Sequence, residues 1–213
     1  MTMNLSHYKN IIFDLGGVIL NLDYHRTFDA FKRFAPQIDD DTFVGKSNQH
    51  TIFSDYEIGK ISTQDFRASL NSFYKMNLTD DIFDSCWNAM LLDLPWHRIE
   101  LIQNLKTSGK KVFLLSNINE IHEREVDLRF KSLGFNFHFK ELFHKAYYSH
   151  EIGLRKPSRE VFELVLSENK IEKIETVFID DSLQHIRGAD SLGLKAVHHQ
   201  ASFKLENYFN EFN

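Results

Sequence analysis

The sequence predicts an α/β protein with a Rossmann-like parallel sheet core and a helical cap inserted after the first strand. Two observations lead to this fold class. Short apolar segments alternate with stretches of helical period from about residue 95 onward, which is typical of a parallel sheet covered by helices on both faces. A segment of about 70 residues that lacks this alternation separates the first apolar segment from the second.

Five short apolar segments are predicted to be strands of one sheet. Four of them are strong, at residues 10–15 (NIIFDL), 111–116 (KVFLLS), 145–149 (KAYYS) and 176–180 (TVFID), and a weaker one lies at 194–199 (LKAVHH). Apolar runs of this kind are typical of buried strands. Helical periods at 97–108, 119–133, 158–170 and 182–192 predict the covering helices, and Ser158 is a candidate N-cap for the third.

Residues 22–94 are predicted to form the helical cap, and residues 1–21 and 95–213 the core. Within the cap, Ser62 and Asp65 resemble a capping box that opens a helix with Phe66, Leu70 and Phe73 on its apolar face. An insertion at the carboxyl end of the first strand lies above the crevice where open α/β sheets bind ligands. The cap is therefore predicted to act as a lid.

Composition indicates a soluble globular protein. The 213 residues are 42% hydrophobic and 26% charged with a net charge of −5, so no global basic field would attract nucleic acid. No apolar run approaches the roughly 20 residues that cross a bilayer, and the start lacks the features of a signal peptide. Cys86 is the only cysteine, which favours a reducing cytoplasm. We expect no nucleic-acid or membrane partner, and the sequence leads to no prediction of an oligomeric state.

Polar side chains stand at the ends of the strong strands. Because the carboxyl ends of parallel strands lie at one edge of a sheet, we expect these side chains to converge. Each has an ordinary structural reading as a turn, a helix cap or a solvated loop, but their occurrence together at successive strand ends favours a site. The set is Asp14, Ser116-Asn117, Lys156 in the loop GLRKP, and Asp180-Asp181.

This set predicts phosphoryl chemistry. Asp14 with the Asp180-Asp181 pair makes an anionic, all-oxygen site of the kind that suits Mg²⁺. A metal ion and a lysine together can neutralise a phosphoryl group while a carboxylate attacks it. The Ser116 hydroxyl and nearby backbone N–H groups can bind the remaining phosphoryl oxygens.

The motifs FDLGGV (13–18), LLSN (114–117), RKP (155–157) and FIDDS (178–182) resemble those of the haloacid dehalogenase-like hydrolase superfamily. The inserted helices are similar to that family's cap. The segments DLGGVIL, SNINEIH and IGLRKP resemble its bacterial sugar-phosphatase branch, typified by α-D-glucose-1-phosphate phosphatase. The resemblance implies a Mg²⁺-dependent phosphatase that passes through an aspartyl-phosphate and acts on small phosphomonoesters such as hexose 1-phosphates.

The resemblance also implies roles for single residues. Asp14 would be the nucleophile and a metal ligand. The backbone carbonyl of Gly16 and the carboxylate of Asp180 would bind the metal, and Asp181 would do so directly or through water. The phosphoryl group would be held by Ser116, the Asn117 backbone and Lys156, with Lys156 also positioning Asp14.

One position departs from the commonest family pattern. Most of the phosphatases carry a general acid two residues after the nucleophile, where this chain has Gly16. General acid–base help is worth about 10²–10⁴-fold, so hydrolysis of ordinary alkyl phosphates is in question. Asp23 could substitute, although a surface-loop position is the simpler reading of that residue.

Two alternatives remain open at this stage. A metal-independent 2-haloacid dehalogenase also lacks the second acid, but the paired aspartates of FIDDS would repel Asp14 without a cation. A non-catalytic phosphate-binding member of the superfamily is the other alternative. We further expect Asn119 to start a helix, His122 to be exposed, and the C-terminal segment FKLENYFNEF to dock as a helix.

Overall fold

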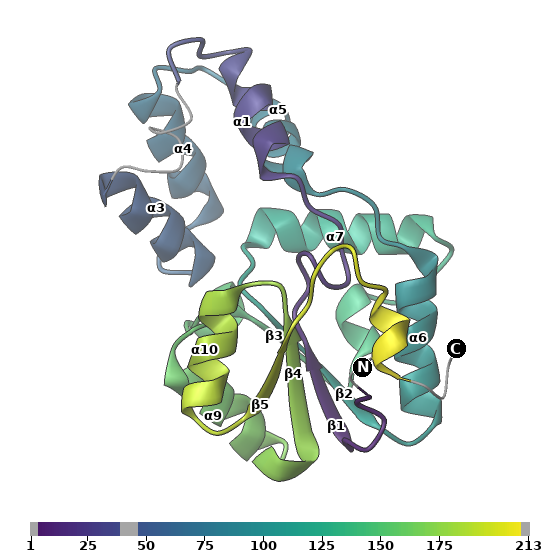
Figure 1. Ribbon diagram of the computed structural model, residues 1–213. Coiled ribbons are helices and arrows are strands. Elements are labelled where there is room, and N and C mark those ends of the chain that lie inside the picture. Colours follow the sequence, from purple (N-terminus) through teal and green to yellow (C-terminus); the bar gives the residue numbers. More distant parts are fainter. Residues whose placement is uncertain (1–3, 39–46, 210–213) are drawn as a thin grey trace.

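The computed structural model describes residues 4–38 and 47–209 and contains a five-stranded parallel sheet (Figure 1). The strands follow the order β3-β2-β1-β4-β5. They are β1 (Asn10–Phe13), β2 (Lys111–Ser116), β3 (Lys145–Tyr148), β4 (Thr176–Asp180) and β5 (Lys195–His198). The five predicted strands are thus confirmed, and β1 ends earlier than expected because the chain turns away after Phe13.

Helices cover both faces of the sheet, as predicted. Ile11 and Phe13 of β1 point into the core shared with α6 (Trp96–Thr107) and α7 (Glu120–Ser132). Ile12, on the opposite face, packs in the core shared with α9 (Arg159–Glu168) and α10 (Leu183–Ser191). This alternation follows from the two-residue period of a strand. It also fixes the register of β1 with β2 and β4, and in this register the carboxyl ends of the strands lie at the same edge of the sheet.

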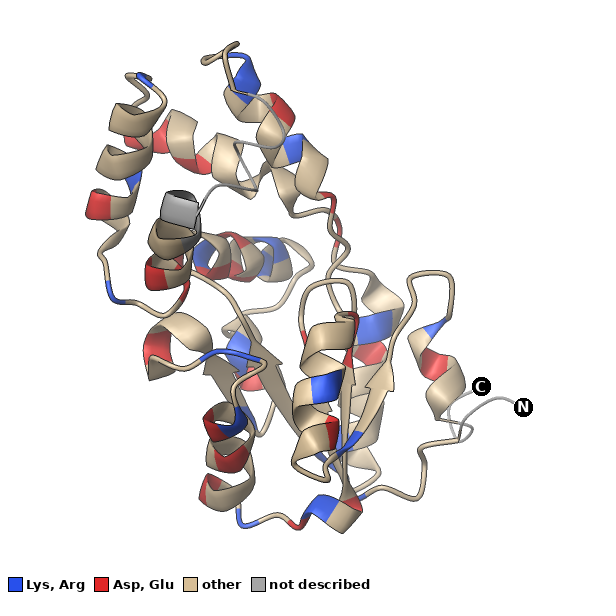
Figure 2. Ribbon diagram, turned by 60° about the vertical axis from the view of Figure 1, so that its left-hand side comes forward, with Lys and Arg blue, Asp and Glu red and all other residues tan. Residues whose placement is uncertain are grey.

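Short elements complete the fold. They are α8 (Ser149–Ile152) and single 3₁₀ turns at Asn88–Met90, Phe139–Leu142, Lys173–Glu175 and Leu205–Tyr208. In the described part of the predicted C-terminal docking helix, only the last of these turns forms, and it docks through Leu205, Tyr208 and Phe209, all buried; residues 210–212 of that segment lie outside the described residues. Acidic and basic residues are interspersed along α7 (Figure 2). Three ion pairs form within this helix, each between two side chains that are one helical turn apart. Among the described residues, every helix is too short or too polar to span a bilayer.

The inserted segment folds as helices above the sheet in Figure 1, around a second hydrophobic core that Ile121 of α7 completes. Phe66 lies at its centre, with ring centroids of Tyr56 at 4.0 Å, Trp87 at 5.0 Å and Phe83 at 5.8 Å. Cys86 is buried in the same core. The helices are α1 (Tyr24–Lys32), α3 (Ser47–Glu57), α4 (Thr63–Phe73) and α5 (Asp80–Trp87).

The two connections to this insertion run side by side. Leu22 and Leu91 form an antiparallel bridge, and the Leu92 N–H donates to the carbonyl of Asn21 at 2.9 Å. Two arginines of the core hold this ribbon: Arg98 donates to the side-chain oxygen of Asn21 at 3.0 Å, and Arg129 donates to the carbonyl of Leu91 at 2.6 Å. Both connections between the core and the insertion are therefore fixed by hydrogen bonds.

Local signals in the insertion were read correctly at Ser62 and incorrectly at Phe73. Ser62 caps α4 by accepting the Asp65 N–H at 3.1 Å, and its hydroxyl donates to the Asp65 carboxylate at 2.6 Å. Phe73 was expected on the buried face but is 51% exposed, because the buried stripe of this helix continues from Leu70 to Tyr74, which is 5% exposed. In the core, Ser158 occupies the N-cap position of α9 without a side-chain capping bond.

The expectation of an exposed His122 is wrong. Its ring is buried and stacks on Trp87 at 5.2 Å. Burial lowers the pKa of His122 to about 4, so the ring is neutral. Asn119 caps α7 as predicted, accepting the His122 N–H at 3.1 Å. Sequence pattern could not show that Trp87 of the insertion would cover this turn.

The Phe66 cluster leads to a stability prediction with a control on the same helix. Phe66→Ala should reduce the free energy of unfolding by about 3–5 kcal/mol, since it removes a fully buried ring and leaves a cavity. Phe73→Ala should cost about 1 kcal/mol or less. Urea denaturation followed by fluorescence and circular dichroism measures both. Equal losses would show that Phe66 is not the centre of this core.

Candidate active site

The carboxyl ends of the strands meet around one buried ammonium group. Lys156 is fully buried, and its Nζ donates to Asp14 Oδ1 at 2.7 Å, Asp180 Oδ2 at 2.7 Å and the carbonyl of Leu115 at 2.8 Å. All three N–H bonds of the ammonium are therefore used. The three acceptors come from the ends of β1, β4 and β2, so Lys156 joins the three central strands at one point.

The turn after β1 explains the two glycines of FDLGGV. The backbone N–H of Asp14 still bonds to the carbonyl of Ile179 at 2.9 Å, and the chain then folds back on the Leu15 carbonyl. Gly17 has a φ of 70°, and a Cβ at this position would lie 2.2 Å from Asp181 Oδ2. Only glycine satisfies both conditions. A Cβ on Gly16 would lie 2.6 Å from Leu22 Cδ1.

Asp180 is held as a carboxylate by several donors. Its Oδ1 accepts the N–H of Ser182 at 2.7 Å, and the Nδ1 of His185 lies 3.0 Å from both of its oxygens. Burial alone would raise the pKa of Asp180, but Lys156 and His185 outweigh it and lower the pKa to about 2. Asp180 therefore carries a negative charge inside the protein at neutral pH.

Asp14 has the opposite balance. Burial and the neighbouring charge of Asp180 outweigh the attraction of Lys156 and raise the pKa of Asp14 to about 6. One oxygen from each of Asp14, Asp180 and Asp181 lies within 4.8 Å of the others. Asp181 is the exposed member of the set, and burial and Asp180 raise its pKa as well. Three hard oxygen donors so placed fit a divalent cation such as Mg²⁺.

Asn117 fixes the loop that carries Lys156. Its side-chain Nδ2 donates to the carbonyl of Lys156 at 3.0 Å, and its Oδ1 accepts the Lys156 N–H at 2.9 Å. Ser116 precedes it as the last, buried residue of β2. The Asn117 side chain thus binds the Lys156 loop, which leaves its backbone as the part that could face a ligand.

Ser149 connects this edge of the sheet to the insertion. Its buried hydroxyl accepts the Ile118 N–H at 2.9 Å and lies 2.6 Å from the carbonyl of Glu57, at the end of α3. Beside it, Arg155 Nη1 lies 2.9 Å from Glu57 Oε2 and 2.9 Å from Ser54 Oγ. The insertion therefore contacts the core at the residue next to Lys156.

The structure brings together the site residues that the sequence indicated. Asp23, the suggested substitute acid, instead caps α1 by accepting the His25 N–H at 3.2 Å, and it pairs with Arg26 at 3.4 Å. The predicted group lies at adjoining strand ends and in the turn after β1: Asp14, Gly16, Ser116, Asn117, Lys156, Asp180 and Asp181.

Two side chains that contact this group were not indicated by the sequence. His185, on the first turn of α10, contacts Asp180, and a polar residue one turn after FIDDS could have suggested it. Ser149 follows β3 directly, so it fits the same pattern of polar residues at strand ends that indicated the others.

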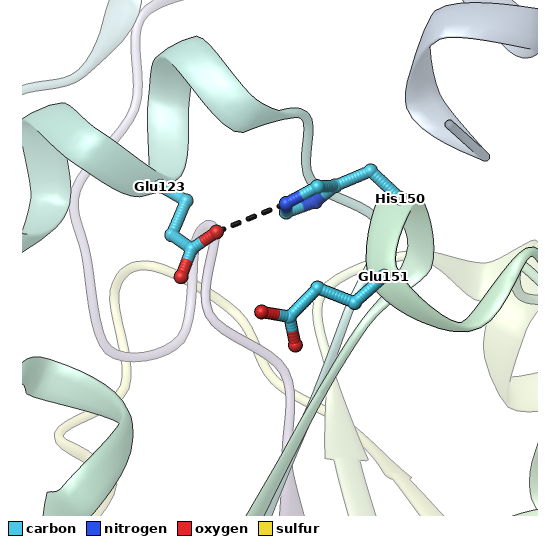
Figure 3. Close-up of side chains that lie close together, drawn as sticks. All are labelled: Glu123, His150 and Glu151. Atoms are coloured by element: carbon cyan, nitrogen blue, oxygen red, sulfur yellow. Dashed lines mark ion pairs between the residues drawn. The ribbon is translucent and has the colours of Figure 1, made fainter. Parts of the chain in front are cut away.

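A second group of candidate ligands is formed by Glu123, His150 and Glu151 (Figure 3). Glu123 Oε2 pairs with His150 Nε2 at 2.9 Å, while His150 Nδ1 donates to the carbonyl of Ile118 at 2.8 Å. Burial would lower the pKa of His150, but these two bonds raise it. Lys140 Nζ lies 3.1 Å from Glu151 and 3.7 Å from Glu123. The cluster is therefore compensated by its own cations and fastens α8 to α7.

Comparison with known proteins identifies the relatives of this chain. It is 30% identical over 188 residues to a D-ribitol-5-phosphate phosphatase from Bacteroides thetaiotaomicron, covering 88% of this chain and 89% of that one. It is 25% identical over 194 residues to a sesquiterpene phosphatase from Aspergillus oryzae, covering 90% and 89%.

A solved structure agrees with these relatives. A haloacid dehalogenase family enzyme from Bacteroides thetaiotaomicron, in complex with magnesium and inorganic phosphate, matches with a TM-score of 0.82 and 32% identity over 92% of this chain and 96% of that one. The model of the haloacid dehalogenase-like hydrolases matches residues 8–193. The resemblance found in the four motifs is thereby confirmed, and the chain belongs to the haloacid dehalogenase-like hydrolase family.

Proposed function

We propose that this protein is a Mg²⁺-dependent phosphatase that hydrolyses small phosphomonoesters of sugars and sugar alcohols, hexose 1-phosphates among them, through an aspartyl-phosphate on Asp14. The observation that carries the proposal is the buried Lys156, bonded at once to Asp14 and to Asp180 beside Asp181. This arrangement keeps one carboxylate oriented within a cluster of oxygen ligands. The phosphatases among the relatives support a phosphate ester as substrate.

The site residues divide into metal ligands and phosphoryl-binding groups. Asp14, Asp180, Asp181 and the carbonyl of Gly16 would hold Mg²⁺, which when bound neutralises charge on the phosphoryl oxygens. The Ser116 hydroxyl, the Asn117 backbone N–H and the positive charge of Lys156 would hold the phosphoryl group itself.

The reaction takes place at Asp14 in two steps. A carboxylate oxygen of Asp14 attacks phosphorus, and the bond from phosphorus to the alcohol oxygen breaks. Gly16 offers no acid, so the departing oxygen takes its proton from water. A water molecule then attacks the phosphorus of the aspartyl-phosphate, which releases inorganic phosphate and restores the Asp14 carboxylate.

Lys156 acts mainly on the orientation of Asp14. Its three N–H bonds are occupied by Asp14, Asp180 and the Leu115 carbonyl, so it contributes charge to the phosphoryl site without a donor to spare. Residues 22–94 serve as the cap over the core formed by 1–21 and 95–213. The contacts of Glu57 with Arg155 and Ser149 support a closed position of this cap beside Lys156.

The first test replaces the nucleophile. Asp14→Asn should lower the rate of phosphate ester hydrolysis by at least about 10³-fold, because an amide cannot attack phosphorus, while the fold persists. Asp23→Asn is the matched control and should retain activity, since asparagine also caps a helix well. Steady-state kinetics with 4-nitrophenyl phosphate and thermal unfolding measure both. Wild-type turnover by Asp14→Asn would exclude an aspartyl-phosphate.

The second test concerns the metal. Hydrolysis of aryl phosphates should require Mg²⁺ and should stop in excess chelator, because three carboxylates around one ammonium need a further cation. Activity should return when Mg²⁺ is added back. Chloride release from 2-chloropropionate in the presence of chelator would instead identify a metal-independent dehalogenase, and phosphate binding without turnover would identify a non-catalytic member.

The third test concerns the leaving group. Without an acid at Gly16, hexose 1-phosphates should be cleaved faster than the 6-phosphates of the same sugars, because the anomeric oxygen carries negative charge better. A plot of log kcat/KM against leaving-group pKa should have a steep negative slope. An aspartate at position 16 should flatten it by helping poor leaving groups, by up to about 10²–10⁴-fold.

The structure decides which variant to make for this plot. A side chain at position 16 would meet Leu22 Cδ1 at 2.6 Å, so Gly16→Asp should be combined with Leu22→Ala, and Leu22→Ala alone is the control. Single-turnover rates must show that chemistry limits the reaction. A shallow wild-type slope that the double variant leaves unchanged would mean that another group already supplies the proton.

A further inference from the structure

A cavity of about 570 Å³ opens beside the catalytic carboxylates, and its size is within the range of small-molecule sites. Gly17 and Asp181 form the wall that it shares with the active centre, while Leu22, Leu92 and Ala201 add apolar atoms. Among the described residues of the lining there is one acidic side chain, Asp181, and no lysine or arginine. The cavity therefore suits the uncharged alcohol part of a phosphate ester better than its phosphoryl group.

Tyr24 is the large aromatic side chain of this lining. It is 65% exposed, so its ring is open to a molecule in the cavity. Loss of hydration beside the protein surface, together with the negative charges of Asp181 and Asp14, raises the pKa of Tyr24 to about 12. The side chain is therefore uncharged and lies within electrostatic reach of both carboxylates. Aromatic side chains are typical of the walls of small-molecule sites.

The backbone at Tyr24 is fixed, although this residue belongs to the insertion. Leu22 forms the bridge to Leu91, and the Asp23 N–H donates to the carbonyl of Met90 at 2.9 Å. Asp23 also caps α1, the helix that Tyr24 begins. Tyr24 therefore stands at the connection to the core, and the ring is held at the wall of the cavity by the same hydrogen bonds that hold this connection.

We propose that the ring of Tyr24 is a specificity-determining contact, against which the carbon skeleton of the substrate alcohol packs in this cavity. With Leu22 and Leu92 the ring makes an apolar wall, and the C–H groups of a sugar or the face of an aryl ring can pack on it. This inference rests on the proposed phosphatase activity and names a residue that distinguishes its substrates. Esters of a bulky alcohol are preferred to esters whose leaving group is too small to reach the ring.

The test compares two substrates that both have good leaving groups but differ in size. 4-Nitrophenyl phosphate carries a ring that can reach Tyr24, whereas the leaving group of acetyl phosphate is much smaller. Tyr24→Ala should lower kcat/KM for 4-nitrophenyl phosphate by about tenfold, the loss of one aromatic contact. The loss should appear mainly as a higher KM, because the contact is made in the bound substrate as well as in the transition state. Acetyl phosphate should lose less than about twofold.

Two control variants separate recognition from other effects. Tyr24→Phe keeps the ring and should keep the wild-type kinetics with both substrates. Phe34→Ala removes an exposed aromatic side chain shortly after the end of the same helix and outside the cavity, and it should also leave the kinetics unchanged. Tyr24→Ala should keep the melting temperature, since Tyr24 is exposed. Inhibition by inorganic phosphate should be the same in all variants, because phosphate has no alcohol part to reach the ring.

The outcomes distinguish this inference from the proposed function. Unchanged kinetics in Tyr24→Ala would overturn the role of the ring, and an equal loss in Tyr24→Phe would assign the effect to the hydroxyl instead. Equal losses with both substrates, or weaker inhibition by phosphate, would mean that Tyr24 acts on the catalytic carboxylates, which also overturns the inference. If 4-nitrophenyl phosphate is hydrolysed in an Asp14-dependent way in these cases, the proposed phosphatase stands while the inference fails. Absence of any phosphate ester hydrolysis would overturn both.

Discussion

The buried ammonium of Lys156 is the constraint on which the rest of the site depends. A charge with no solvent contact needs acceptors for each of its N–H bonds, and here these are Asp14, Asp180 and the Leu115 carbonyl. Breaking a buried pair of this kind typically costs about 3–5 kcal/mol. Three strands must therefore end in fixed register, and the loop that delivers Lys156 must be held by Asn117. Stability and catalytic geometry come from the same contacts.

Charge balance explains the properties of Asp14. Three carboxylates around one ammonium leave two negative charges unbalanced, and a divalent cation carries the charge that compensates them. Lys156, His185 and the Ser182 N–H stabilise Asp180 in its charged form. The cost of the excess negative charge therefore appears at Asp14. The pKa of Asp14 is raised to about 6 as a result of burial and of Asp180. A bound cation would lower this pKa again and favour the carboxylate form of Asp14, which its proposed role as nucleophile requires.

Sequence reasoning succeeded where the information is local. An apolar run that ends in Asp14 or Asp180 predicts both a strand and a carboxylate at its end. The parallel topology of the sheet then brings these ends together. Sequence reasoning failed where the exposure of a side chain depends on which helix or strand packs over it. His122 is buried because Trp87 of the insertion stacks on it. The exposure of Phe73 is likewise set by tertiary packing, and so is the burial of the His199 ring nitrogens, which have no hydrogen-bond partner among the described residues. No short motif encodes such packing.

Gly16 links the chemistry of the site to its architecture through Leu22. The space that a Cβ at position 16 would need is occupied by Leu22 Cδ1. Leu22 also forms the bridge to Leu91 where the chain enters the insertion, and it lines a cavity of about 570 Å³ that Asp181 lines as well. A carboxylate at position 16 would therefore displace a residue that serves both the crossing and the cavity. The packing around position 16 thus leaves no room for an acid. A substitution that supplied one would change the leaving-group chemistry, the connection to the insertion and the shape of the cavity at the same time.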